Sequence, residues 1–527
     1  MRNEPTRRAA LKLAGMAGLA AVATACTGGS DDHQSSAPPS SSPATSSGSA
    51  VPTTPASSAP SRPTYAQLRS QLSGRLATPG QSGYQPDALL YNPRFAGQVK
   101  PKAIAHCSKP SDVVDCVRFA ANGGADLRVR NGGHSYGGWS VGSGLVVDVA
   151  GLDDVSVDHN AMMATIGAGA LLGNVYEKLD TKGVSIGAGS CATVGITGLT
   201  LGGGVGLLTR SYGLTCDQLT SAQVVTADGR TATASAKEHP DLFWALRGGG
   251  GSFAAVTSLT FSVRAAPQVK QVYLEWSGKD AAQVLSAWQQ WSPGTPRELW
   301  STCKILARPG DGVRATITVV WTGKGSPAKQ VKALLQNTPR PRTNSPSANS
   351  YGAAMLASAG CDGSAAQCIS AALTPAQRLP EAATSSILTK ALPDNAVRAI
   401  VNTVQNGMDV DGMVEGGVSF DALGGAVSDA GADDTAFPWR SAIADIQYTA
   451  TWPYKKAHDP SRYDQFVHRE RTALLPFVGS SAYVNYADAT LTDYATAYWG
   501  PNLARLQQVK QTYDPHGVFS FPQAVPR

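Results

Sequence analysis

Three glycine-rich segments in the first half of this chain restrict its fold more than any other feature of the sequence. They read RNGGHSYGG (130–138), GAGSCATVG (187–195) and GLTLGGGVG (198–206). Glycine at this density favours turns with positive φ and lets the backbone approach a ligand closely. Backbone N–H groups in such turns can bind an anion. The segments predict either tight turns between strands or a phosphate-binding site, and they contain two nucleophilic side chains, His134 and Cys191.

Taken together, these segments resemble the flavin-binding motifs of the berberine bridge enzyme-like family, within the wider vanillyl-alcohol-oxidase fold. In that family the His of R-x-G-G-H-S-Y-x-G is bonded to the flavin 8α-methyl group, and the Cys of G-x-C-x-x-V-G is bonded to flavin C6. His134 and Cys191 stand at these two positions. The resemblance covers the chain from Asn92 to the C-terminus and implies an FAD held by two covalent bonds.

The resemblance also assigns the neighbouring residues to the FAD site. Besides His134 and Cys191, they are Arg130, Asn131, Gly132, Gly133, Ser135, Tyr136, Gly137, Val194, Gly195, Gly198, Gly202, Gly203, Gly204, Gly206 and Asn485. In the family, Val rather than Leu at the position of Val194 accompanies access of O2 to the flavin. We therefore expect an oxidase that releases H2O2 rather than a dehydrogenase.

Hydride transfer from a substrate alcohol to flavin N5 needs a base for the hydroxyl proton. We assign this role to Tyr486, with Tyr483 as the alternative. Because a free Tyr has a pKa of about 10, Tyr486 needs a partner that accepts its proton or stabilises its anion. Asp421 occupies the place of an Asp that assists the Tyr in sugar-oxidising members, and Gln447 resembles a substrate-contacting Gln. Packing roles for Tyr486 and Asp421 are the structural alternatives.

A further segment, DLFWALRGGGG (241–251), resembles another motif of the family, but its continuation differs. Ser252 and Ala254 replace the family's Asn and Gly. Because Ala tolerates positive φ poorly, this replacement bears on the local backbone path. Trp439 stands where the family often carries His.

The N-terminal residues predict export. TRRAALK (6–12) resembles a twin-arginine signal, and the apolar run 13–25 is too short for a permanent bilayer span. ATAC (23–26) resembles a lipobox that would make Cys26 the lipidated N-terminus, although Ala23 stands where Leu is usual. Plain cleavage before Cys26 is the alternative. We expect an exported cell-surface lipoprotein or secreted protein, without a transmembrane helix in its mature form.

Eight cysteines are present, and export permits disulfides. Cys361–Cys368, in a stretch of small residues, is the first expected pair and Cys107–Cys116 the second. Neither spacing is C-x-x-C and no His accompanies them as a metal set, which argues against zinc.

Composition sets the size of the protein and excludes one class of partner. The 527 residues are 42% hydrophobic, enough for a large core or for two to three domains. The net charge is only +6, from 44 Lys and Arg against 38 Asp and Glu. Over this length, and without a basic run with interleaved aromatics, that excess does not indicate nucleic-acid binding.

The periodicity predicts an α+β fold, which the resemblance resolves into a two-part α/β FAD-binding domain of PCMH type and a substrate domain whose antiparallel sheet is covered by helices. The expected parts are a signal (1–26), a disordered Ser/Pro/Ala linker (27–63), an FAD-binding domain (64–266, PCMH-type from about 97), a substrate domain (267–475) and a returning C-terminal segment (476–527). A helix after an N-cap at Ser111 is predicted, and residues 343–367 are predicted to form a long loop.

Three functions remain open on this basis. The first is oxidation of a sugar lactol or a secondary-metabolite hydroxyl, with O2 as electron acceptor. The second is oxidative ring closure or desaturation of a natural product. The third is a tethered binding lipoprotein that kept the fold and lost the chemistry.

Overall fold

The first sheet carries the strand that leads into the first glycine-rich segment. The computed structural model describes residues 62–527 except 88, 375–376 and 457–458, so the predicted signal, Cys26 and nearly all of the predicted linker lie outside the described residues. The strands are β1 (Arg75–Ala77), β2 (Ala103–His106), β3 (Leu127–Arg130) and β4 (Leu145–Asp148), in the order β1-β2-β4-β3. β2, β4 and β3 are parallel, and β1 pairs antiparallel with β2. The helices nearby in the chain are α1 (Tyr65–Gln71), α2 (Tyr84–Asp87) and α3 (Pro110–Ala121).

A second sheet follows, and every strand pair in it is antiparallel. Its order is β5-β6-β10-β8-β9, with β5 (Val155–Asp158), β6 (Met163–Gly167), β8 (Leu219–Val225), β9 (Thr231–Ser235) and β10 (Ala255–Ser262). A short pair joins β7 (Val184–Ser185) to β11 (Arg264–Ala265). The helices of this region are α4 (Leu172–Thr181), α5 (Ile196–Leu201), α6 (Thr209–Tyr212) and α7 (Pro240–Ala245).

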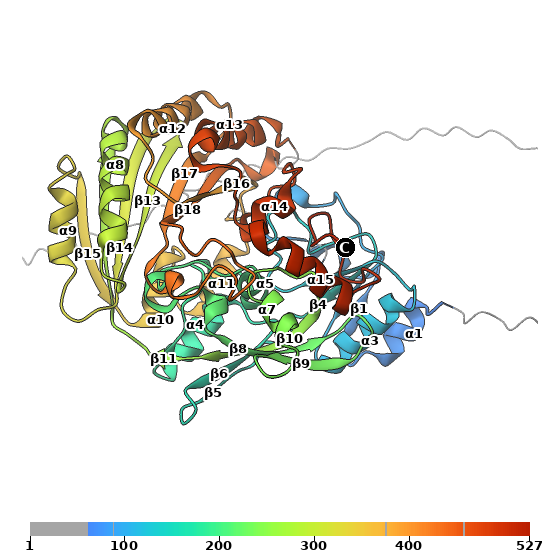
Figure 1. Ribbon diagram of the computed structural model, residues 1–527. Helices are drawn as coiled ribbons and strands as arrows, with labels where there is room; N and C mark the ends of the chain where they lie inside the picture. The colour runs from blue at the N-terminus through green and yellow to red at the C-terminus, as the bar shows by residue number, and fades with distance from the viewer. Residues whose placement is uncertain (1–61, 88, 375–376, 457–458) are drawn as a thin grey trace, which may run out of the picture. The chain divides into compact units, whose positions relative to one another are not determined.

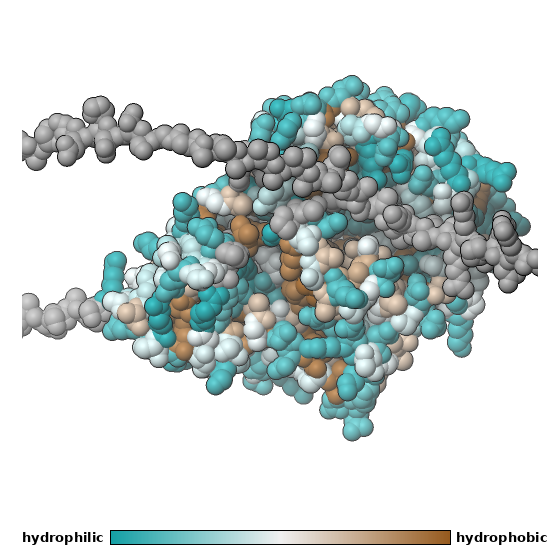
Figure 2. Space-filling model, turned by 180° about the vertical axis from the view of Figure 1, so that it is seen from behind, coloured by the Kyte–Doolittle hydropathy of each residue, from teal (hydrophilic) through white to brown (hydrophobic). Residues whose placement is uncertain are grey.

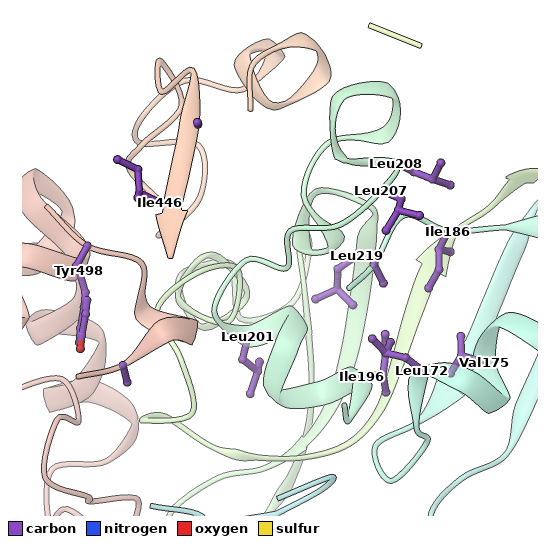
Figure 3. Close-up of a cluster of buried hydrophobic side chains, with 14 of the residues drawn as sticks. Leu172, Val175, Ile186, Ile196, Leu201, Leu207, Leu208, Leu219, Ile446 and Tyr498 are labelled. Carbon is purple, nitrogen blue, oxygen red and sulfur yellow. The ribbon is translucent and has the colours of Figure 1, made fainter. Parts of the chain in front are cut away.

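Buried leucine and isoleucine side chains hold the second and third glycine-rich segments against this region. Ile196 and Leu201 of α5 belong to the same buried cluster as Leu172 and Val175 of α4 (Figure 3). All four are at most 6% exposed. The apolar core therefore anchors the backbone that joins the two glycine-rich segments.

The third sheet has seven antiparallel strands in the order β15-β12-β14-β13-β17-β18-β16. They are β12 (Val269–Ser277), β13 (Leu299–Arg308), β14 (Gly312–Trp321), β15 (Thr343–Asn349), β16 (Glu381–Leu388), β17 (Glu415–Ala422) and β18 (Ala444–Thr451). The helices α8 (Ala281–Trp291), α12 (Asp394–Asn406) and α13 (Ser461–Val478) contact it and lie along one side in Figure 1, and α9 (Ala328–Leu335) packs on α8. This arrangement confirms the predicted α+β class with a helix-covered antiparallel sheet.

The C-terminal segment returns to the first part of the chain. α14 (Tyr494–Trp499) and α15 (Leu503–Tyr513), drawn in red in Figure 1, follow a 3-10 turn at Val484–Tyr486, and α15 contacts α7. Residues Pro63–Arg527 form one compact unit, so the boundaries predicted inside it near 266 and 475 stay predictions.

The predicted loop over residues 343–367 is wrong. This stretch forms β15, α10 (Tyr351–Ser358) and the start of α11 (Ala365–Ala372). β15 gains its structure from pairing with β12, and Pro346 is tolerated because β15 is the edge strand. Ser350 and Ser364 accept hydrogen bonds as N-caps of the two helices. Tertiary pairing and capping therefore outweigh the weak local pattern.

Two further corrections are local. α3 begins at Pro110, not after an N-cap at Ser111, because Pro fits the first helical position, where no N–H is needed. Ala254 causes no backbone strain, since the positive φ values of this bend fall on Gly248 and Gly250. Ser252 Oγ instead accepts a hydrogen bond from the Val525 N–H at 3.0 Å.

One expected disulfide is confirmed and the other is wrong. Cys361 and Cys368 are bonded. Cys107, directly after β2, and Cys116, within α3, are free buried thiols that contact each other through a hydrogen bond without a covalent link.

Hydrophilic residues predominate on the face drawn in Figure 2, and hydrophobic ones form small separate groups there. Among the described residues, no helix combines the length and the apolar character needed to cross a bilayer.

A buried carboxyl group in α13 leads to a prediction about stability and pH. Glu470 is fully buried, and both its carboxyl oxygens lack a hydrogen-bond partner among the described residues. Desolvation raises the pKa of Glu470 well above its ordinary value. In the folded protein the Glu470 carboxyl group therefore keeps a proton that it releases in the unfolded chain above pH ~4.3. Because of this difference, the contribution of Glu470 to the free energy of unfolding falls as the pH rises beyond that value.

Glu470→Gln should therefore be more stable than the parent at neutral pH, with a difference that shrinks toward pH 4. The slope is at most about 1.4 kcal/mol per pH unit. Denaturant unfolding between pH 4 and pH 8 measures it, with Glu298→Gln on the exposed surface as the matched control. If the free energies of unfolding of the parent and of Glu470→Gln change with pH in the same way, the prediction is contradicted.

Candidate functional site

A cavity of about 510 Å3 brings the three glycine-rich segments together with later parts of the chain. Its volume lies in the range of about 300–1,000 Å3 that is usual for small-molecule and cofactor sites. We name the segments the His134 loop (130–138), the Cys191 loop (187–195) and the third glycine loop (198–206). The wall is completed by residues of the bend 250–256, β16, β18 and the C-terminal stretches 484–487 and 519–523.

The His134 loop and the Cys191 loop pack directly on each other through glycines. A Cβ at Gly195 would lie 1.8 Å from Asn131 Oδ1, and a Cβ at Gly132 would lie 2.6 Å from Gly195 N. Asn131 Oδ1 also accepts a hydrogen bond from Thr197 N–H at 3.3 Å. Neither glycine can carry a side chain here, and this close contact brings His134 and Cys191 to the same cavity wall.

His134 is held on two sides. The ring of Tyr91 stacks on the imidazole with centroids 3.7 Å apart and an interplanar angle of 20°. Thr193 Oγ1 lies 2.9 Å from His134 Nε2 and 3.5 Å from Cys191 Sγ. Desolvation lowers the pKa of His134 to about 3, so the imidazole is neutral and retains a nucleophilic lone pair.

The C-terminal segment is bonded to the third glycine loop. Tyr483 Oη accepts hydrogen bonds from Gly204 N–H at 2.8 Å and from Asn485 Nδ2 at 2.9 Å, and Asn485 Nδ2 also donates to Leu199 O at 2.9 Å. A Cβ at Gly202 would collide with Asn485 Oδ1 at 2.1 Å. Tyr483 is 2% exposed and does not line the cavity. Its hydrogen bonds therefore hold the third glycine loop in position.

Three polar side chains meet at the side of the cavity nearest the third sheet. Gln447 Nε2 donates to Tyr136 Oη at 2.7 Å, and the Tyr136 ring lies edge-on to that of Tyr486, with centroids 5.6 Å apart. Desolvation raises the pKa of Tyr486 well above 10, and the charges of Asp445 and Asp421 add to this effect. Tyr486 therefore keeps its own proton in the resting protein.

Asp421 and Asp445 are directly opposite each other on β17 and β18. Asp445 is 1% exposed, and its two carboxyl oxygens have no hydrogen-bond partner among the described residues. Desolvation first, and then the charge of Asp421, raises the pKa of Asp445 well above its ordinary value. Because like charges directly opposite in a sheet repel, this pair holds a proton that an isolated Asp would lose.

The structure brings most, but not all, of the residues singled out from the sequence to the cavity. Those that line it are His134, Cys191, Asn131, Gly132, Gly133, Ser135, Tyr136, Val194, Gly195, Gly198, Asn485, Tyr486 and Gln447. Arg130, Gly137, Gly202, Gly203, Gly204, Gly206, Tyr483 and Asp421 are not among the lining residues. Arg130 is bonded instead to the Asp148 carboxylate at 2.6 Å, which fixes the start of the His134 loop.

Sequence reasoning missed four residues of this region: Tyr91, Thr193, Glu381 and Asp445. Asp445 could have been found, because it lies two residues before Gln447 and strand alternation puts both on one face. Glu381 lines the cavity, and desolvation raises its pKa to about 7. Tyr91 and Glu381 are brought to the cavity by tertiary contacts, which no local sequence pattern predicts.

The cavity wall fits a flavin dinucleotide in two respects. Asn131 Nδ2 and Ser140 Oγ are buried polar atoms that line the cavity and have no partner among the described residues, so a ligand with acceptor oxygens would satisfy them. Gly198 and Gly251 face open space, where an added Cβ would meet nothing within 4 Å. A ligand can therefore approach bare backbone at these positions.

Comparison with known proteins agrees with this geometry. Residues 101–235 match the model of the FAD binding domain, and residues 482–526 match the model described as "Berberine and berberine like". The FAD-linked oxidoreductase YgaK of Bacillus subtilis is 32% identical over 87% of this chain and 98% of its own length. The glucooligosaccharide oxidase of Sarocladium strictum is 31% identical over 83% and 89%. The structure of Physcomitrella patens BBE-like 1 superposes with a TM-score of 0.79 at 28% identity, over 88% and 98%.

Proposed function

Because this chain belongs to the berberine bridge enzyme-like family of FAD-linked oxidoreductases, we propose that it is an oxidase of a substrate alcohol, a sugar lactol or a secondary-metabolite hydroxyl. We further propose that FAD is bonded to both His134 and Cys191 and that O2 is the electron acceptor. The observation that carries the proposal is one cavity wall that holds both nucleophiles together with Tyr486 and Gln447. The relationship to a glucooligosaccharide oxidase supports a carbohydrate substrate.

The residues around the cavity have distinct roles in binding the cofactor. Asn131, Ser140 and the backbone of Gly198 and Gly251 would bind FAD without covalent bonds, and His134 and Cys191 would add the linkages. When bound, FAD supplies the hydride acceptor, and the protein supplies position and electrostatics.

Removal of the proton from the substrate hydroxyl is the protein's main chemical task. Tyr486 Oη accepts this proton, and it can do so only if its own proton moves on, because burial raises its pKa. The Asp421 carboxyl group is the acceptor, because it lies opposite Asp445, which already holds a proton, and its charge acts on Tyr486. Gln447, bonded to Tyr136, is placed to orient a substrate hydroxyl by hydrogen bonding.

The face of the third sheet that carries these groups is suited to a polar substrate. Ser419 and Asp421 of β17 alternate with Phe420, whose ring faces Trp288 of α8 on the covered side, 6.0 Å away. Gln447 pairs with Ser419 on the same face as Asp445. Hydrogen-bonding side chains on that face suit a substrate rich in hydroxyl groups.

We also propose that the protein works outside the cytoplasm. The twin-arginine-like signal supports export, and Cys26 supports a lipid anchor, with simple cleavage before Cys26 as the alternative.

Val194 lines the cavity, which supports access of O2.

The proposal predicts stoichiometric H2O2 release when the purified protein is given the right alcohol. A screen of mono- and oligosaccharides and aromatic alcohols, with a peroxidase-coupled readout, tests it, and the heat-inactivated protein is the control. Product analysis separates simple oxidation from ring closure or desaturation. Flavin-free protein that binds sugars without turnover would contradict the proposal and favour a binding lipoprotein.

A further inference from the structure

One hydroxyl group contacts both side chains assigned to covalent attachment. Thr193 Oγ1 lies 2.9 Å from His134 Nε2 and 3.5 Å from Cys191 Sγ. Thr193 is 1% exposed and is not among the cavity-lining residues. It therefore reaches His134 and Cys191 from within the protein and leaves their cavity side open.

The direction of the hydrogen bond to His134 decides which imidazole nitrogen can react. The neutral ring carries one N–H, so the other nitrogen has the lone pair. If Nε2–H donates to Thr193 Oγ1, then Nδ1 keeps a free lone pair. If Thr193 donates to Nε2 instead, the proton is on Nδ1 and the single lone pair is already engaged. Only the first arrangement leaves a nucleophilic nitrogen.

The same arrangement orders the contact with Cys191. When Thr193 Oγ1 accepts from His134, its own O–H is free to donate toward Cys191 Sγ. A chain from His134 Nε2–H through the hydroxyl to the sulfur then holds both groups. Tyr91 completes the constraint, because its stacked ring fixes the imidazole plane and its N–H bonds to Gly133 O at 3.2 Å within the His134 loop.

We propose that Thr193 is a positioning residue for covalent FAD attachment, which holds His134 as the Nε2–H tautomer with Nδ1 as the nucleophile and aligns Cys191 Sγ at the same time. This inference rests on the covalent linkage of the proposed function. At His134, a bond forms between Nδ1 and the 8α carbon, and one C–H bond of the methyl group and the Nε2–H bond break. At Cys191, a bond forms between Sγ and C6, and one C–H and the S–H bond break. Each attachment releases two electrons and two protons, and O2 takes them up as H2O2.

The matched variants Thr193→Val and Thr193→Ser test this role. Valine has nearly the same shape but no hydroxyl, whereas serine keeps the hydroxyl and loses a methyl group. Each protein is produced with the same FAD supply, denatured and digested, and the fractions of the His134 and Cys191 peptides that carry FAD are measured by mass spectrometry. Thr193→Ser should match the parent in these fractions. In a second measurement, apoprotein is incubated with FAD, and Thr193→Val should then attach FAD to His134 about tenfold to a hundredfold more slowly than the parent.

Two outcomes distinguish failure of this inference from failure of the proposed function. A parent protein without FAD on either peptide overturns the covalent linkage itself. A doubly linked parent together with an equally fast Thr193→Val overturns only the role of Thr193. If Thr193→Val does not fold, the parent still decides, because peptide fragmentation and NMR of the FAD-linked His134 should show attachment through Nδ1, and attachment through Nε2 overturns the proposal.

Discussion

Replacing both His134 and Cys191 by alanine should yield a protein from which all FAD separates on denaturation. Each single variant should keep one linkage, because the two side chains reach the cavity wall from different loops. The measurement is the flavin absorbance left in an acid-precipitated pellet, together with fluorescence of the protein band in a denaturing gel. The double variant should lose essentially the whole signal of the parent.

A buried thiol elsewhere serves as the control for this experiment. Cys303 lies in β13, is fully buried and does not line the cavity, so Cys303→Ala should leave the pellet as yellow as the parent. A double variant with a yellow pellet would show that another side chain bonds the flavin. A parent with a colourless pellet would show that FAD is held without covalent bonds, and the native spectrum would then report whether it is bound at all.

Tyr486→Phe should slow flavin reduction by substrate by about 10²- to 10⁴-fold, the usual contribution of a positioned acid or base. The change removes one hydroxyl and keeps the ring that packs against Tyr136. The rate of flavin bleaching after anaerobic mixing with substrate is the measurement, and FAD content and thermal stability should stay close to those of the parent.

Tyr483→Phe provides the matched comparison, because it also removes a single tyrosine hydroxyl. That hydroxyl accepts hydrogen bonds from Gly204 N–H and Asn485 Nδ2 and lies outside the cavity wall. Its loss should lower the temperature of unfolding and leave the rate of flavin reduction within about tenfold of the parent. Equal losses of rate in both variants would contradict the assignment of Tyr486 as the base.

Local patterns predicted the parts of this fold that depend on local physics. The α+β class and a helix in the region of Ser111 follow from apolar periodicity, and both are present in the structure. Residues 343–367 were mispredicted because β15 depends on its neighbour β12, which is 60 or more residues away along the chain. Ser111 was a reasonable cap in isolation, but Pro110 begins the helix one residue earlier.

The site was predictable to the extent that it lies within continuous motifs. The two loops with His134 and Cys191 are such motifs, and the structure brings both to one wall. The proton-accepting side of the site depends instead on register, because Asp421 faces Asp445 only through the pairing of β17 with β18. Tyr91 and Glu381 come from segments that carry no motif of their own, so only the folded chain reveals them.

The cavity wall draws on residues from Tyr91 to Gln523, so it can close only after Gln523 has left the ribosome. A nascent chain can present the His134 loop early, but Asn485 and Tyr486 complete the enclosure late. Capture of FAD in the closed cavity therefore follows the synthesis of all these segments. A secretion pathway for unfolded chains would postpone that capture until after transport, whereas one for folded proteins would allow loading beforehand, where FAD is made.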